Sequence, residues 1–252
     1  MLSDFTPSKP AKFISDQEVH LWLVDVADTH EKNVMSQLQS YLSEDEKLRM
    51  AGFRKQESQH RFLAARGALR LILAGLQKAG DPAGMQFTVN DHGKPFLTTN
   101  PENLHFNLSH SGDMILIAMT RGRDCGVDIE RMNSARNFNE LADFYFHPSE
   151  RDVISAAKGD ADIMHRFYTL WSLKEAFIKA EGKGMAIAGD SFYFTGIDSL
   201  QSEVVTTADS QTSGRHWLFS CELYRQDYSM ALAVEKINER DITVKRQRLV
   251  FD

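Results

Sequence analysis

The sequence has little cysteine and lacks a long apolar run. Its 252 residues include two cysteines, and neither has the spacing of a disulfide framework, a redox pair or a zinc site. Free cysteines of this kind are usually buried, so we expect Cys125 and Cys221 to be reduced core thiols. The longest apolar run, Met114 to Met119, is far below the ~20 residues that span a bilayer, and the N-terminus has no signal-peptide core. These absences predict a cytoplasmic protein with no membrane segment.

The chain also lacks an excess of positive charge. It has 29 basic and 35 acidic residues, a formal net charge of −6, and therefore no overall field that would gather nucleic acid or an anionic membrane. An anionic ligand would have to be bound by a local basic cluster. The nine histidines show no paired spacing suited to zinc, so any metal site is expected to use oxygen ligands.

The first half of the sequence predicts a strand, a long helix and a set of antiparallel strands. Val19 to Val24 alternates with a period of two, and a capping box at Ser43 to Glu46 begins a helical region. The long helix is expected from Ser58 to Lys78, with Gly80 ending it. The later strands are expected at 86–89 and 104–108, followed by a hairpin with strands at 114–120 and 125–129.

The second half repeats this order of elements. A helical stretch from 137 to 180 is followed by strands near 192–194, 217–223 and 230–234. His60-Arg61-Phe62 and His165-Arg166-Phe167 begin the two helical segments, which is a weak sign of an internal repeat. We therefore expect an α+β fold of two similar halves, residues 1–118 and 119–252. Each half would be a small antiparallel sheet packed against a long helix, with the active site at their join.

Three carboxylates and one lysine form the most informative chemical pattern. Asp128 and Glu130 are two apart on a predicted strand, so their side chains lie on the same face. Glu175 and Lys179 are four apart on a predicted helix and also share a face. If the three carboxylates met within ~5 Å, each pair would repel by roughly 3 kcal/mol at an effective dielectric of about 20. Mg²⁺, which prefers oxygen ligands, would remove that cost.

The same residues have a plainer interpretation. Asp128 and Glu130 could close an exposed strand end, while Glu175 and Lys179 could form an ion pair on a solvated helix face. Spacing alone leaves both interpretations open.

Four segments occur in a recognisable order around these residues. They are Gly93-Lys94-Pro95, Phe106-Asn107-Leu108-Ser109-His110-Ser111, Gly126-Val127-Asp128-Ile129-Glu130 and Trp171-Ser172-Leu173-Lys174-Glu175-Ala176-Phe177-Ile178-Lys179. In order and spacing these segments resemble the 4′-phosphopantetheinyl transferases of the surfactin-synthetase-activating type. The resemblance extends from about Tyr41 to Lys183 and is faint beyond Phe192.

The resemblance implies a set of site residues. Asp128, Glu130 and Glu175 would coordinate Mg²⁺, and Glu175 would also help to deprotonate an incoming serine. Lys179 would neutralise the transferring phosphate, and His110 would act beside it as a further catalytic residue. The residues implied to bind coenzyme A are Arg49, Arg66, Arg70, Lys94, Ser109, His110, Lys174 and Lys179.

The resemblance also implies a reaction and a partner. The reaction is the Mg²⁺-dependent transfer of phosphopantetheine from coenzyme A to a serine of an acyl or peptidyl carrier protein, with release of 3′,5′-ADP. Two alternatives stay open: an Mg²⁺-dependent pyrophosphate hydrolase acting on ligands like coenzyme A, and a non-catalytic protein that binds coenzyme A or a carrier. Four aromatic residues are candidates for an apolar carrier contact or for an internal core, namely Phe138, Phe144, Tyr145 and Phe146. A monomer would be sufficient, because both halves lie on one chain.

Overall fold

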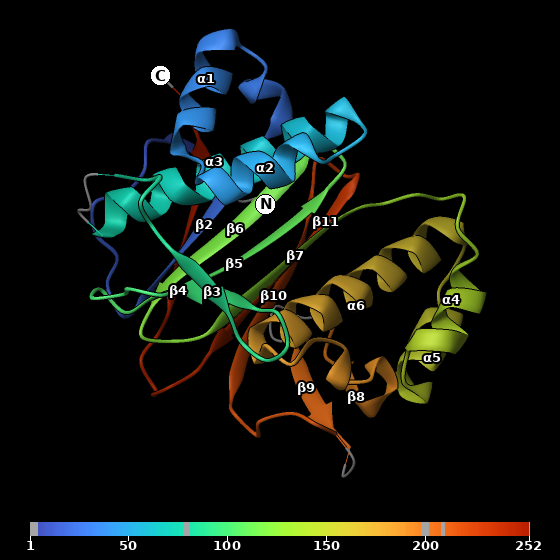
Figure 1. The fold of residues 1–252 in the computed structure, drawn as a ribbon. Coiled ribbons are helices and arrows are strands. Elements are labelled where there is room, and N and C mark those ends of the chain that lie inside the picture. Colours follow the sequence, from blue (N-terminus) through green and yellow to red (C-terminus); the bar gives the residue numbers. More distant parts are fainter. Residues whose placement is uncertain (1–4, 78–80, 198–201, 208–209, 252) are drawn as a thin grey trace.

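The computed structural model describes residues 5–77, 81–197, 202–207 and 210–251. The chain forms two main sheets, each accompanied by a long helix (Figure 1). The elements of the first part are β1 (Thr6–Ser8), β2 (Glu18–Asp25), η1 (Val26–Thr29), α1 (Lys32–Tyr41), α2 (Glu44–Ala51), α3 (Gln56–Gln77), β3 (Phe87–Val89), β4 (Pro95–Leu97), β5 (Leu104–Ser111) and β6 (Met114–Arg121). Those of the second part are β7 (Cys125–Arg131), α4 (Phe138–Tyr145), α5 (Pro148–Ser155), α6 (Asp160–Glu181), η2 (Gly184–Ala186), η3 (Gly189–Ser191), β8 (Phe192–Thr195), β9 (Glu203–Thr206), β10 (Trp217–Tyr224), β11 (Tyr228–Glu235) and β12 (Thr243–Leu249).

The two parts share one topology. In the first, β2, α3, the short β3–β4 pair and the β5–β6 hairpin follow one another, and β6 pairs with β2. In the second, β7, α6, the short β8–β9 pair and the β10–β11 hairpin follow one another, and β11 pairs with β7. The predicted α+β fold of two similar halves is therefore confirmed.

The chain crosses between the halves twice. Residues 122–124 connect β6 to β7, and the expected boundary between residues 118 and 119 stays a prediction. Later, β12 returns to the first sheet, where it pairs in parallel with β1 on one side and β2 on the other. The last strand of the chain thus ties the second half to the first.

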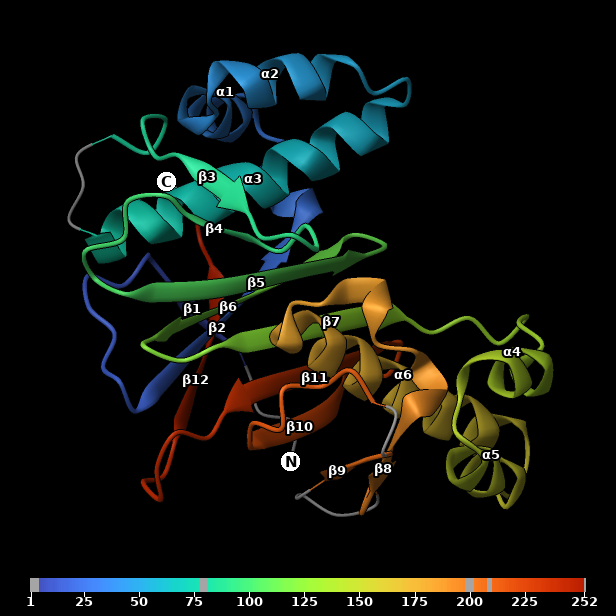
Figure 2. The same ribbon diagram turned by 60° about the horizontal axis from the view of Figure 1, so that its bottom comes forward.

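Apolar clusters stack the elements as helix, sheet, sheet and helix (Figure 2). α3 buries Leu69 and Leu73 on the face of the first sheet that contains Ile117, and α6 buries Phe177 on the face of the second that contains Ala231. The opposite faces of both sheets pack together in one cluster that includes Val19, Leu21, Leu23, Leu116, Ala118, Val127, Ile129, Met230 and Leu232. Because side chains alternate along a strand, Asp128 of β7 is turned away from that cluster and toward α6.

The predicted elements mostly agree with the structure. The capping box is present, because Ser43 Oγ accepts from the Glu46 amide at 3.4 Å and the Glu46 carboxylate accepts from the Ser43 amide at 3.2 Å. The predicted strands at 19–24, 104–108, 217–223 and 230–234 lie within β2, β5, β10 and β11. The expected helix end at Lys78 and Gly80 lies outside the described residues. Within the described ranges, no helix combines the length and apolar character needed to cross a bilayer.

The expected hairpin between residues 114–120 and 125–129 is wrong. β6 pairs with β2 along one edge and with β5 along the other, so it has no edge left for β7. The hairpin partner of β6 is β5, through a turn in which Gly112 has a φ of 56°. Residues 121–124 instead direct the chain from the first sheet into the second, where β7 pairs with β11.

Gly126 allows the closest approach between β7 and α6. A Cβ atom added there would lie 2.1 Å from the carbonyl oxygen of Ala176 and 2.4 Å from the amide nitrogen of Ala180, distances that atoms cannot adopt. The backbone of α6 therefore lies almost directly on the backbone of β7. This contact sets the height of the α6 side chains above the β7 carboxylates.

We expect Gly126→Ala to destabilise the protein by about 3 kcal/mol or more, because the clash is with backbone atoms that cannot repack without moving the helix. Urea-induced unfolding measures the change. Gly52→Ala is the matched control, since Gly52 is exposed at the end of α2 with an ordinary φ of −74°, and its effect should stay within about 1 kcal/mol. Equal effects of the two substitutions would show that α6 does not lie this close to β7.

Candidate active site

β5 and β7 lie side by side and are joined by side chains of β5; we call this junction the seam. Asn107 Oδ1 accepts from the Val127 amide at 2.9 Å. Two residues further along β5, Ser109 Oγ donates to Asp128 Oδ1 at 3.0 Å, and after two more Ser111 Oγ donates to Glu130 Oε2 at 3.0 Å. Alternation along β5 places these polar groups on one side of the strand. The seam therefore positions both β7 carboxylates.

Lys179 of α6 completes the cluster at the seam. Its ammonium lies 2.7 Å from Asp128 Oδ1 and 2.9 Å from Ser109 Oγ. Asp128 is 2% exposed, so its charge requires compensation, and Lys179 provides part of it. Among the described residues, Asp128 Oδ2 is buried without a hydrogen-bond partner. Burial, followed by the nearby charge of Asp128, raises the pKa of Glu130 above its usual value.

Glu175 enters the same pocket from α6. Its Oε1 accepts a hydrogen bond from the Tyr145 hydroxyl at 2.8 Å. The pocket at the seam, of about 380 Å³, is lined by Leu108, Ser109, His110, Asp128, Glu130, Trp171, Glu175 and Lys179. The structure therefore brings all three predicted metal-binding carboxylates to one pocket.

Whether this pocket suits a metal ion depends on the side-chain oxygens that line it. Across the described ranges, no three His, Cys, Asp or Glu side chains are already close enough together to hold a metal ion. The oxygen-only donors and the unpartnered Asp128 Oδ2 nevertheless suit a hard divalent cation such as Mg²⁺. Asp128, Glu130 and Glu175 are the residues that could hold it.

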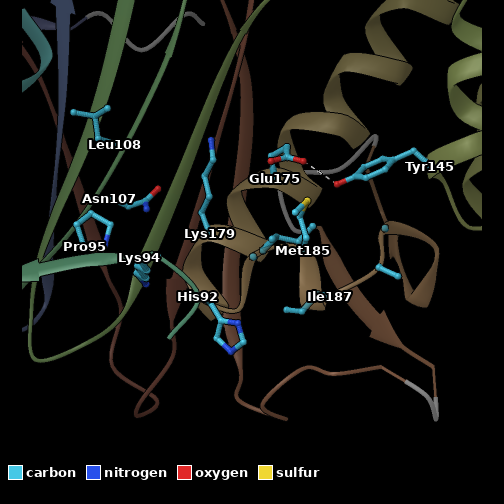
Figure 3. Close-up of a pocket in the computed structure, with 16 residues that line it drawn as sticks. His92, Lys94, Pro95, Asn107, Leu108, Tyr145, Glu175, Lys179, Met185 and Ile187 are labelled. Carbon is cyan, nitrogen blue, oxygen red and sulfur yellow. Dashed lines mark hydrogen bonds between the residues drawn. The ribbon is translucent and has the colours of Figure 1, made fainter. Parts of the chain in front are cut away.

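Two larger pockets adjoin the seam pocket, and all three share Leu108. One, of about 480 Å³, is basic and aromatic, and its lining includes Arg49, Phe53, Ser58, Arg61, Phe62, Arg66 and His110. The other, of about 570 Å³, is mainly apolar, and its lining includes Lys94, Pro95, Tyr145, Ile178, Met185 and Ile187. Figure 3 shows Lys179 and Glu175 between Leu108 on one side and Tyr145 on the other. The arrangement suits an elongated anionic ligand that bends at the seam.

The arginine side chains of the basic pocket are held by ring contacts and, for Arg66, by an ion pair with Glu46 at 3.5 Å. The Arg49 guanidinium lies 5.5 Å from the ring centre of Phe62, and that of Arg66 lies 5.5 Å from the ring centre of Phe87. Burial, followed by the positive charge of Arg61, lowers the pKa of His110. His110 lies at the boundary of the basic pocket and the seam pocket, where a ring nitrogen can donate to a ligand.

Two residues predicted to bind coenzyme A are not brought to these pockets. Arg70 is 2% exposed, and its guanidinium donates to Glu46 Oε2 at 2.7 Å and to the Pro82 carbonyl at 2.6 Å. Lys174 is fully buried, and its ammonium lies 2.7 Å from the Glu150 carboxylate. Both cations are used inside the protein, so their donors are not available to a ligand.

Lys94 has a mixed position. It lines the apolar pocket, but its ammonium donates to the carbonyl oxygens of Ala180 at 2.8 Å and Cys125 at 3.3 Å. These contacts join the Gly-Lys-Pro turn of the first half to α6 and β7 of the second. A ligand that reached this ammonium would compete with backbone carbonyls.

Three residues near the pockets were missed as site residues. Arg61 lines the basic pocket, and its helical spacing with Ala65 and Leu69, which line the same pocket, would have revealed it. Ser111 could have been found from its alternation with Ser109 on β5. Tyr145 was considered only as an apolar contact, and nothing in its spacing points to Glu175.

Comparison with known proteins identifies the class. The model of the N-terminal 4′-phosphopantetheinyl transferase domain matches residues 29–122, and that of the 4′-phosphopantetheinyl transferase superfamily matches residues 124–233. The 4′-phosphopantetheinyl transferase HetI of Nostoc sp. PCC 7120 is 33% identical over 182 residues, 71% of this chain and 75% of HetI. The chain therefore belongs to the 4′-phosphopantetheinyl transferase family.

Two further proteins are similar to this chain. The 4′-phosphopantetheinyl transferase Sfp of Bacillus subtilis is 33% identical over 153 residues, 61% of this chain and 66% of Sfp. A holo-(acyl-carrier-protein) synthase from Bacillus anthracis, solved in complex with coenzyme A, is 18% identical with a TM-score of 0.38 and covers 44% of this chain and 94% of that structure. The predicted resemblance to the surfactin-synthetase-activating, or Sfp, type is confirmed, and the chain is a transferase of this class.

We expect Lys174→Met to destabilise the protein by about 3–5 kcal/mol, because it leaves the buried Glu150 charge without its partner. Chemical denaturation measures the loss. Adding Glu150→Gln should recover a large part of it, since the second change removes the unpaired charge. Lys236→Met, which breaks the exposed pair with Glu239, should cost less than about 1 kcal/mol. A stable Lys174→Met single variant would contradict the structural role and return Lys174 to the candidate ligands.

Proposed function

We propose that this transferase moves the 4′-phosphopantetheine group of coenzyme A to a serine hydroxyl of an acyl or peptidyl carrier protein, with Mg²⁺, and releases 3′,5′-ADP. The observation that carries the proposal is the buried Asp128, which pairs with Lys179 through Oδ1 and has no hydrogen-bond partner for Oδ2 among the described residues. It lies in the pocket that adjoins a basic pocket and an apolar pocket. The three parts of coenzyme A follow one another in the same order as these pockets: the nucleotide for the basic pocket, the pyrophosphate for the seam pocket and the pantetheine arm for the apolar pocket.

The basic pocket suits the phosphorylated nucleotide. Arg49, Arg61 and Arg66 supply positive charge there, and Phe53 and Phe62 supply aromatic surface for a base. A protein with a net charge of −6 does not attract an anionic ligand as a whole, but this local cluster of arginines does. The mainly apolar pocket suits the uncharged pantetheine arm.

The seam pocket suits the pyrophosphate. Asp128, Glu130 and Glu175 would hold Mg²⁺, which, when bound, neutralises charge on the pyrophosphate oxygens. Lys179 places a second positive charge beside the same oxygens, and Ser109 holds Lys179 and Asp128 in register through contacts of 2.9 and 3.0 Å. His110 would donate to a phosphate oxygen from the side of the basic pocket.

The transfer exchanges one phosphorus–oxygen bond for another. The serine oxygen bonds to the phosphorus nearer the pantetheine, and the bond from that phosphorus to 3′,5′-ADP breaks. The serine proton passes to Glu175, either directly or through a water molecule at the site. Such reactions depend mainly on in-line positioning and charge neutralisation. The residues at the seam provide both.

The location of the site supports further parts of the proposal. Residues of both 1–118 and 119–252 line the seam pocket and the apolar pocket, whereas residues of 1–118 line the basic pocket. Because one chain supplies these linings, a monomer would be sufficient. Phe138 and Phe146 are buried in the core, whereas Phe144 is 88% exposed next to Tyr145. Of the four aromatic candidates, Phe144 is therefore the one available to a carrier protein. We place the enzyme in the cytoplasm, where coenzyme A and carrier proteins meet.

We expect an apo carrier protein incubated with the chain, coenzyme A and Mg²⁺ to gain about 340 Da, the mass of the transferred group. Intact-mass spectrometry measures the gain. EDTA should abolish it, and so should Asp128→Asn, because that substitution removes the charge at the centre of the seam. Asp143→Asn is the matched control, since Asp143 is exposed and forms a surface pair with Arg151, and it should load the carrier at the wild-type rate.

The same experiment separates the alternatives. Consumption of coenzyme A without a carrier would indicate a hydrolase. Binding of coenzyme A with no consumption and no mass gain on several carriers would indicate a binding protein. Full activity of Asp128→Asn would remove the metal assignment.

A further inference from the structure

Tyr145 makes a contact with Glu175 that the proposed reaction does not require by itself. It is the last residue of α4, and its hydroxyl lies 2.8 Å from Glu175 Oε1. An ionised carboxylate has no proton to donate, so the phenol is the donor. Both side chains line the apolar pocket, and Glu175 also lines the seam pocket. The phenol thus reaches Glu175 within the apolar pocket, and Figure 3 shows its hydroxyl directed at the Glu175 carboxylate.

The ring of Tyr145 has two close neighbours. It packs against Trp171 of α6, with ring centres 4.7 Å apart. Gly189 also lies against Tyr145, because a Cβ atom added to this glycine would be 2.8 Å from Tyr145 Cε2 and 2.6 Å from the Tyr145 carbonyl oxygen. A ring packed against an indole and a backbone segment has little freedom to leave Glu175.

The buried ion pair described above supports this arrangement from behind. Lys174 donates to the Gly189 carbonyl at 2.7 Å and pairs with Glu150 at 2.7 Å. Lys174 and Glu175 are neighbours on α6, one directed into the core and the other into the pocket. The pair therefore fixes the backbone against which Tyr145 rests.

We propose that Tyr145 is a positioning residue, whose hydroxyl holds Glu175 Oε1 so that Oε2 faces the incoming serine. A glutamate has several rotatable bonds, and one fixed oxygen removes most of that freedom before the substrate arrives. The inference rests on the proposed function, because it assigns Glu175 the role of proton acceptor. Tyr145 is not among the residues assigned above to the coenzyme A phosphates or to Mg²⁺.

Tyr145→Phe tests the inference, because it removes the hydroxyl and keeps the ring contacts with Trp171 and Gly189. We expect kcat for carrier loading to fall by roughly tenfold to a hundredfold, the effect of a misplaced catalytic group, while KM for coenzyme A changes by less than about twofold. Tyr193→Phe is the matched control, because Tyr193 stacks on His147 at 4.6 Å and lines none of the three pockets. It should retain full activity.

A second measurement separates positioning from a general structural effect. Tyr145→Phe is combined with Glu175→Gln, and slow loading is followed over hours at high enzyme concentration. If Tyr145 acts through Glu175, it should have no further effect in the Glu175→Gln background. An equal loss in both backgrounds, or a Tyr145→Phe enzyme within about twofold of the wild type, overturns the inference. Failure of the proposed function is distinguishable, because the wild-type enzyme would then load no carrier at all.

Discussion

The site depends on the contact between Asp128 and Lys179 across the seam. A carboxylate that is 2% exposed is costly unless charge and hydrogen bonds compensate it, and here a lysine and a serine engage one of its oxygens. The three groups come from β5, β7 and α6, so the contact exists only when both halves are in place. Gly126 allows α6 to lie on β7 at the required height. Among the described residues, the second oxygen of Asp128 has no hydrogen-bond partner, which supports the proposed cation site.

Each of the two larger pockets is supported by a buried glutamate that forms an ion pair in the adjacent core. Glu46 and Glu150 are both the third residue of a capped helix, and each pairs with a cation on the following long helix, Arg70 on α3 and Lys174 on α6. The two pairs occupy corresponding places in the two halves. Each pair ties a short helix to its long helix and so supports the pocket in front of it. The internal symmetry therefore extends from the strand order to the charged residues of the core.

The sequence predicted the two halves, because period-two and helical spacing depend on local geometry alone. The family resemblance supplied Ser109, Asp128 and Lys179 at the seam, whereas Ser111 was missed. The expected hairpin at residues 121–124 failed because a turn does not reveal whether a strand edge is already occupied, and β6 is paired on both sides. The expectation that Arg70 and Lys174 bind ligand differs from the structure for a similar reason. Their positions in the sequence do not show that each cation pairs with a buried glutamate. The contact of Tyr145 with Glu175 joins α4 to α6 and has no local signal.

The measurement that tests the central claim most directly is calorimetric binding of coenzyme A in the presence of Mg²⁺. The wild-type enzyme should bind, and Lys179→Ala should weaken binding by about tenfold or more, because the charge beside the pyrophosphate is lost. Lys158→Ala, at an exposed position between α5 and α6, should bind like the wild type. Equal affinity of the Lys179→Ala enzyme and the wild type would contradict the placement of the pyrophosphate at the seam.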